Sequence, residues 1–206
     1  LYIGVYNGSS GIYNLSDTGS LSAGNEYIGF SGTGTFDQTS GSHTVSSSLY
    51  VGVYNGSDGT YNLSGTGSLS AAYETIGYSS TGIFSQSGGT NTVSNRLYIG
   101  SQDVGNGTYN LSGGNLSADN SYIGGSYSAS GGSGTLNVSV DGDALISSAL
   151  KLWDAGVVNL SGGSLKADTI DNTSGGSFNM TGGTLSVDTF LGDLSIMGGT
   201  LAPGNS

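Results

Sequence analysis

The chain has 206 residues, of which 40 are glycine, one is proline and none is cysteine, and 14 acidic against 3 basic side chains give a formal charge of -11. Three separated cations cannot neutralise a phosphate backbone, so the composition argues against a nucleic-acid partner. The lack of cysteine excludes a disulfide framework, and no apolar run is long enough to span a membrane as a helix.

Charged residues make up only 8% of the chain, against ~25% in ordinary globular domains. Disorder is one explanation of so much glycine and serine. However, 34% of the residues are apolar, including 13 tyrosines and 5 phenylalanines, and they recur at regular intervals. The composition therefore predicts a folded repeat.

The first unit, residues 1–24, is expected to form three short strands. Apolar and small polar residues alternate in 2–4, 13–16 and 20–22, which is the period of a strand. Glycine-rich joints such as 7–11 supply the backbone freedom that corners require. Three strands and three corners in about 24 residues predict one coil of a parallel β-helix.

The same unit recurs along the chain. Residues 1–48 align with 49–96 without a gap and are identical at 31 of 48 positions, and a third copy starts at Leu97. Each copy divides into two coils. One residue per coil is expected to stack in a core ladder, formed by Tyr13, Phe36, Tyr61, Phe84, Tyr109, Leu136, Val158, Phe178 and Leu194. A second expected core column is Leu21, Val45, Leu69, Val93, Leu116, Leu145, Leu165, Leu185 and Leu201.

These columns predict an all-β fold, a single-stranded parallel β-helix (β-solenoid) of about nine coils of 16–27 residues, each with three short strands. Right-handed winding is expected for parallel crossover connections. Residues 1–206 are expected to form one β-helix: 1–130 are wide coils in 48-residue double-coil repeats, 131–150 an irregular transition and 151–206 narrower coils. Because Leu1 already lies inside a repeat, we expect a processed product or a portion of something longer.

Several phrases carry a family resemblance. They are GGTLSVDTF from Gly182, GGTLAPGNS from Gly198 and the YNLSGG phrase at Tyr109. The chain resembles the passenger regions of autotransporter-type bacterial surface proteins with autotransporter-associated β-strand repeats. The resemblance implies a secreted β-helix that serves as a stalk, adhesin or matrix component.

A row of tyrosines precedes the aliphatic anchor of most coils. Strand alternation should turn them outward as a column that Thr75 interrupts; its members are Tyr2, Tyr27, Tyr50, Tyr98 and Tyr122. Such a column could simply stabilise the sheet by cross-coil stacking. It could also be an interaction surface for sugars or for a neighbouring chain.

Two polar patterns accompany the core positions. Asparagine recurs beside the core ladder and is expected to hydrogen-bond along the stack, as amide ladders do. Many of these asparagines lie in N-x-[ST] phrases that the repeat generates, so glycosylation is left open. Gln38 and Gln86 replace the leucine of other coils, and we expect their side chains to bond near a corner.

No catalytic residue, cofactor or metal ligand set is predicted. Most carboxylates stand singly, and His43 has neither triad nor metal-ligand spacing around it. Asp141 and Asp143 form a compact acidic pair that could offer oxygen ligands to a hard cation, but two carboxylates are few, and a solvated turn is the alternative.

The function that these features favour is a structural one, and the protein is not expected to be an enzyme. We expect an extracellular or cell-surface bacterial rod that associates with itself end to end into a filament. A carbohydrate-binding or adhesive module with a surface polysaccharide as partner is the alternative. A polysaccharide lyase or hydrolase is the third possibility, which three basic residues make the weakest.

Overall fold

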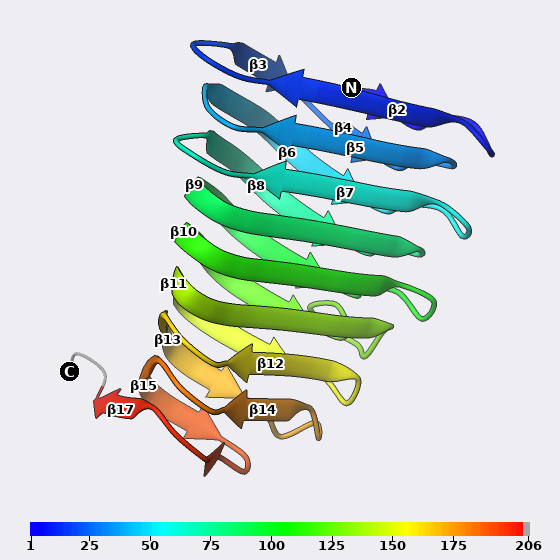
Figure 1. Cartoon of the computed structure of the whole chain (residues 1–206). Helices are drawn as coiled ribbons and strands as arrows, with labels where there is room; N and C mark the ends of the chain where they lie inside the picture. The colour runs from blue at the N-terminus through cyan, green and yellow to red at the C-terminus, as the bar shows by residue number, and fades with distance from the viewer. Residues whose placement is uncertain (204–206) are drawn as a thin grey trace.

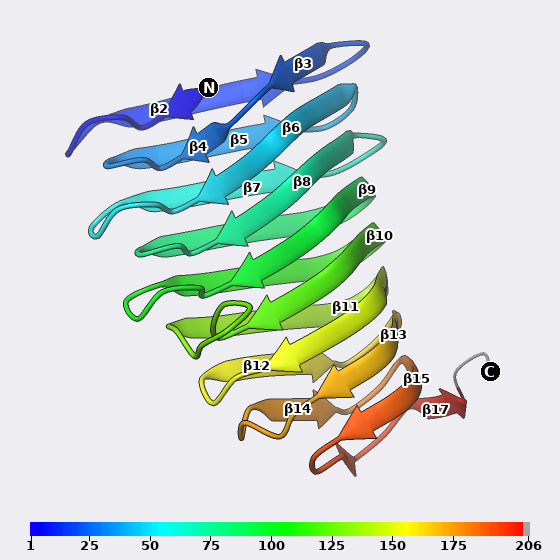
Figure 2. The same cartoon turned by 180° about the vertical axis from the view of Figure 1, so that it is seen from behind.

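The structure, a computed structural model, describes residues 1–203 and is built of 17 strands that belong to one continuous sheet. Its strand pairings between coils are parallel, so the sheet winds into a β-solenoid of about eight turns, close to the nine coils expected. In Figure 1 the chain crosses the near face from right to left, returns along the far face and descends with each turn. Figure 2 shows the far face, and the two views together give the expected right-handed coil. Residues 1–203 contain no apolar helix of membrane-spanning length.

The first ladder of strands covers the near face of Figure 1. Each coil contributes one strand segment, which is either a separate strand or the first part of a longer one. The members are β2 (Ser10–Leu15), β5 (Thr33–Gln38), β7 (Asp58–Leu63), β9 (Thr81–Ile99), β10 (Asn106–Ile123), β11 (Ser133–Leu152), β12 (Gly156–Leu160), β14 (Ser177–Met180) and β16 (Ser195–Ile196).

Two further ladders complete the coil. The second contains β3 (Ser20–Ala23), the first parts of β6 (Ser42–Val51), β8 (Ser68–Ile76), β13 (Ser164–Asp171) and β15 (Thr184–Leu191), and β17 (Thr200–Pro203). The third begins with β1 (Tyr2–Ile3) and β4 (Glu26–Ile28) and continues through the second parts of β6, β8, β13 and β15. The strands β9, β10 and β11 contribute to all three ladders, so three short strands per coil merge into one bent strand in the middle of the solenoid.

Strand length changes along the axis. In the first ladder the separate strands shorten from six residues in β2, β5 and β7 to five in β12, four in β14 and two in β16. The segment 131–150, expected to be irregular, lies largely within β11 and stays paired on both sides. Its extra residues are taken up by register shifts between β10 and β11, the first between Leu111 and Gly113, close to Val140 with its positive φ of 50°.

The core ladder stacks directly, residue on residue. Its five aromatic members lie with ring centroids 4.5–5.0 Å apart and ring planes within 21° of parallel. Leu136, Val158 and Phe178 extend the same column, and Leu194 directly precedes Ser195, the partner of Asn179. Every inner member is shielded from solvent by the coils above and below it, which is how stacking supplies the core that one coil cannot.

The second core column differs from its prediction in three coils. The strand register places three other residues in the column that starts at Leu21. The order along the column is Leu21, His43, Leu69, Asn91, Leu116 and Ala144. The residues predicted for these places are found elsewhere: Val45 and Val93 fill a neighbouring core column, and Leu145 faces outward. The prediction was wrong there because it assumed an apolar residue in every coil, whereas two coils bury a polar side chain instead.

Candidate functional site

The tyrosines expected to face outward lie in one register column on the third ladder. The register aligns Tyr2, Tyr27, Tyr50, Thr75, Tyr98, Tyr122 and Lys151 in that order. The rings of Tyr2, Tyr27 and Tyr50 stack with centroids 4.6 and 5.2 Å apart, and Tyr98 and Tyr122 stack at 5.4 Å. The column therefore consists of two stacked groups with a threonine between them.

A glycine corner brings a second set of side chains beside this column. Gly29 follows the strand β4 with a φ of +68°, and equivalent glycines with positive φ end the third-ladder segment of the other wide coils. The turn places Phe30 edge-on against Tyr27, with centroids 5.4 Å apart. Tyr78, the equivalent residue two coils later, approaches Tyr50 edge-on at 5.7 Å. Edge-on contacts of this kind are favourable for aromatic quadrupoles and fix the corner side chains in place.

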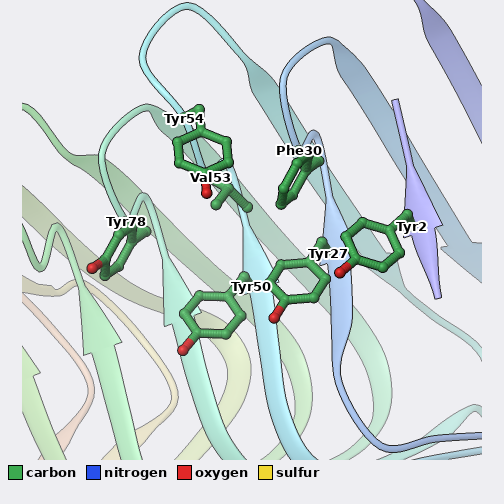
Figure 3. Close-up of a pocket in the computed structure, with 7 residues that line it drawn as sticks. All are labelled: Tyr2, Tyr27, Phe30, Tyr50, Val53, Tyr54 and Tyr78. Carbon is green, nitrogen blue, oxygen red and sulfur yellow. The ribbon is translucent and has the colours of Figure 1, made fainter. Parts of the chain in front are cut away.

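These two sets of side chains enclose an open groove of about 300 Å³. Figure 3 shows the three stacked tyrosines in a row, with the corner residues set beside them. The lining residues are Tyr2, Tyr27, Phe30, Tyr50, Val53, Tyr54 and Tyr78. Aromatic rings and phenolic hydroxyls thus share one concave surface, which suits a ligand that has both apolar and polar groups.

Two tyrosines of this face have hydroxyls whose pKa burial raises, Tyr27 and Tyr122. Burial raises the pKa of Tyr27 above its usual value of 10, and the neighbouring tyrosines add to the shift. Burial also raises the pKa of Tyr122, although Arg96 opposes that shift. Interaction with Tyr98 raises the pKa of Arg96, whose guanidinium lies 4.8 Å from the ring centroid of Tyr127, so a cation borders the far end of the column.

A polar cluster lies inside the solenoid, where the sequence predicted only packing. His43 Nδ1 lies 2.9 Å from the Tyr61 hydroxyl, and His43 Nε2 lies 2.8 Å from Glu26 Oε2. The Tyr61 hydroxyl donates to Gln38 Oε1 at 2.6 Å, and Gln38 Nε2 donates to the carbonyl of Gly41 at 3.1 Å. All four side chains are buried to 1% exposure or less. The bond near the Gly41 corner is the one expected for Gln38.

A second cluster repeats the first, two coils further along the solenoid. Asn91 Nδ2 donates to Glu74 Oε2 at 3.0 Å and to the Tyr109 hydroxyl at 3.1 Å, and that hydroxyl donates to Gln86 Oε1 at 2.6 Å. Asparagine thus replaces histidine at the centre. Burial raises the pKa of Glu74 to about 7, because no cation offsets the cost of a buried charge.

The sequence contains a repeated polar pattern that indicates these clusters. Glutamate, glutamine and tyrosine recur at the same three places of the double coil, Glu26 with Glu74 among them. Polar residues that repeat at core positions with the period of the fold indicate a repeated set of buried partners within the chain. The prediction for His43 considered its sequence neighbours alone, and its partners are 17 and 18 residues away.

The expected asparagine ladder is confirmed in the second half of the solenoid. Asn137 donates to Asn110, Asn159 to Asn137 and Asn179 to Asn159, each through Nδ2 to Oδ1 at 2.8–2.9 Å. In the first half Asn62 donates to Asp37 at 2.7 Å, and Ser85 separates this pair from Asn110.

The acidic pair that we considered for a cation lies on the surface. Asp141 and Asp143 are exposed, and Asp143 Oδ1 accepts a hydrogen bond of 2.6 Å from Ser164. Within residues 1–203, no group of three or more histidines or carboxylates is arranged to hold a metal ion. The clusters around Glu26 and Glu74 are sealed in the core, so the aromatic face is the candidate functional site. Comparison with protein families, with curated proteins and with solved structures gives no match to this chain.

Proposed function

We propose that this chain is a structural repeat protein, a rigid rod of a bacterial cell surface or extracellular matrix that lengthens by stacking coils end to end. One observation carries the proposal: the coils pair in parallel without a break from Tyr2 to Pro203, around one continuous core. Each coil contacts mainly its neighbours, so the rod can grow without a change in its cross-section.

The first and last described coils carry exposed apolar side chains that end-to-end association would bury. Leu201 is 51% exposed, whereas its register partner Leu185 and the next, Leu165, are fully buried. At the opposite end, Leu1 is 40% exposed. A further coil would cover these side chains in the same way as the inner coils cover theirs. A head-to-tail contact that does not close on itself produces a fibre.

The extracellular location rests on the resemblance to autotransporter-type repeats, which the phrases at Gly182 and Gly198 carry. The last three residues of the second phrase lie outside the described residues. We include bacterial secretion and a role as a surface or matrix component in the proposal because of this resemblance.

Negative-stain microscopy and sedimentation velocity test the structural role. Rods should join end to end as the protein concentration rises, and Leu201→Asp should abolish the joining, because a charge would then face the next coil. Leu145→Asp is the matched control, since Leu145 is 41% exposed on the side of the rod, and it should leave the joining unchanged. Rods that stay monomeric at high concentration would refute end-to-end association.

A second candidate function is carbohydrate binding, and the groove of about 300 Å³ favours it. Aromatic rings bury the apolar face of a sugar, and phenolic hydroxyls serve its rim. A glycan array with the wild-type chain and with Tyr54→Ser tests this candidate. Binding of a glycan that the substitution weakens would support it, and an array without a bound glycan would remove it.

A further inference from the structure

Thr75 stands where all the other wide coils of the outward column carry tyrosine. Its register partners are Tyr50 on one side and Tyr98 on the other. Tyr50 stacks on Tyr27, and Tyr98 stacks on Tyr122, so neither ring stacks on a tyrosine at the Thr75 position, and Tyr78 contacts Tyr50 edge-on. The rings of Tyr50 and Tyr98 are therefore two inter-strand spacings apart, which is about 10 Å. One ring placed midway would lie about 5 Å from each, close to the 4.6–5.4 Å of the tyrosine stacks themselves.

A cavity of about 210 Å³ occupies this position, and we call it the Thr75 slot. Tyr50 and Tyr98 form its two walls, Thr75 lies between them, and Tyr78 borders it from the corner. The volume is below the ~300–1,000 Å³ typical of drug-sized ligand sites. The slot thus has room for one ring unit and not for an extended aromatic system.

An unsatisfied hydroxyl lines the same slot. Ser101 is 6% exposed, and its Oγ is buried without a hydrogen-bond partner among the described residues. A buried hydroxyl without a partner is unfavourable, so a site that keeps one gains when a ligand supplies the missing hydrogen bond. Gln102 and Ser126 add further polar groups to the lining.

We propose that the Thr75 slot binds one pyranose ring of a neutral polysaccharide, with the ring held between Tyr50 and Tyr98 and a sugar hydroxyl bonded to Ser101 Oγ. A pyranose has C–H groups on its two faces and hydroxyls around its edge, which matches two aromatic walls and a polar lining. A purely aromatic guest would leave the Ser101 hydroxyl unpaired.

The charge of the site selects a neutral sugar. None of the residues that line the slot is charged, and the whole chain carries -11. Arg96 interacts with Tyr98 but does not line the slot. An acidic polysaccharide would therefore meet overall repulsion without a cation inside the site to offset it. The inference rests on the second candidate function and assigns it a position and a ligand class.

Titration calorimetry with neutral hexasaccharides of glucose, mannose and xylose, and with an acidic oligogalacturonate as comparison, tests the proposal. At least one neutral hexasaccharide should bind at one site per chain. Thr75→Tyr should weaken that binding at least tenfold, because the ring restores the stack and fills the slot. This variant carries the residue found at the equivalent positions, so its melting temperature should not fall, which separates loss of binding from loss of fold.

Two further variants make the test specific. Ser101→Ala should weaken binding about 2- to 10-fold through the loss of one hydrogen bond. Tyr27→Thr should open an equivalent slot between Tyr2 and Tyr50 and raise the stoichiometry from one to two. The new site should be the weaker one, because Val53, two coils before Ser101, stands in the place of its hydroxyl.

The outcomes distinguish sugar binding in the Thr75 slot from sugar binding in the larger groove and from the structural role. No binding of any neutral hexasaccharide, binding of the acidic one alone, or unchanged affinity in Thr75→Tyr would overturn the Thr75 slot. If Thr75→Tyr binds as before and Tyr54→Ser does not, the sugar lies in the larger groove, and carbohydrate binding stands without this slot. The joining of rods is measured without sugar, so the structural role does not depend on any of these results.

Discussion

His43 Nε2 lies 2.8 Å from Glu26 Oε2 in the core, and both side chains are fully shielded from solvent. The direction of the bonds follows from the neighbours. Tyr61 donates its proton to Gln38, so its oxygen accepts from His43 Nδ1, which must carry a hydrogen. The remaining proton lies between Nε2 and the carboxyl, and the pair is either imidazolium with carboxylate or imidazole with carboxylic acid. In both forms it carries no net charge.

Asn91 stands in the second cluster where His43 stands in the first. Replacing His43 by asparagine should therefore leave the buried Glu26 carboxylate without a cationic partner. We expect His43→Asn to lower the free energy of unfolding by about 3 kcal/mol at pH 8, because one partner of a buried pair is removed. Urea unfolding followed by circular dichroism at pH 8 measures the loss. Asn91→His is the reciprocal control and should stabilise the protein at pH 8. An unchanged free energy of unfolding for His43→Asn would contradict the assignment.

The raised pKa of Glu74 gives the protein a pH-dependent stability. The folded pKa is about 7 against a usual 4.5, so the folded state holds the proton more tightly than the unfolded one. The contribution is complete below pH 4.5 and is lost as the pH rises through 7, by roughly 3 kcal/mol in total. Glu74→Gln should remove this loss. Unfolding free energies of both proteins between pH 4 and 8 provide the test, and parallel curves would contradict it.

Two single substitutions in the asparagine ladder should change the stability of the protein in opposite directions. Asn159→Ala removes two hydrogen bonds between side-chain amides, the one donated to Asn137 and the one accepted from Asn179. It should lower the free energy of unfolding by about 1–2 kcal/mol. Ser85→Asn should instead stabilise the protein by about 1 kcal/mol, because Ser85 lies between Asn62 and Asn110 and an amide there would join the two halves of the ladder. Thermal melting compares both variants with the parent. A lower melting temperature for Ser85→Asn would count against the ladder as a source of stability.

The corner glycines should differ according to what lies around them. Gly29 has a φ of +68°, and a Cβ there would collide with the backbone carbonyl of Asp58 in the next coil. Gly29→Ala should therefore cost about 3 kcal/mol or more, since strain and overpacking add. Gly56 has a φ of +85° but nothing within 4 Å, so Gly56→Ala should cost only about 1–2 kcal/mol. Chemical denaturation of the two variants distinguishes them, and equal costs would show that the close approach of coils has no energetic role.

Periodicity was enough to predict the coil and its core ladder, because Tyr13 and Phe36 stand at one place in a repeated pattern of strands and corners. The register of the tyrosine column and its interruption at Thr75 followed from the same alternation, but Tyr122, expected to face outward, is buried at 8% exposure. These features depend on which residues recur, and the sequence displays that directly.

Two features could not be predicted in this way. The position of His43 beneath Leu21 depends on register across a corner, where adding or removing one residue moves a side chain between core and surface. The slot at Thr75 depends on which ring faces are covered, and that follows only from the stacking of Tyr50 and Tyr98 with their neighbours. Both are consequences of contacts between coils and not of any single coil.

Directed cross-linking tests the end-to-end stacking of rods most directly. Ser20 and Thr200 occupy the same place in the second ladder, at its first and last strands, and the chain has no cysteine of its own. If copies stack in register, Cys in place of Ser20 in one copy and of Thr200 in the next come within disulfide range. The Ser20→Cys/Thr200→Cys protein should then give a ladder of dimers, trimers and longer products on a non-reducing gel. Each single variant should give dimers at most, and Ser22→Cys/Thr200→Cys should cross-link poorly. A double variant that yields no product beyond the dimer under oxidation would contradict the proposed stacking.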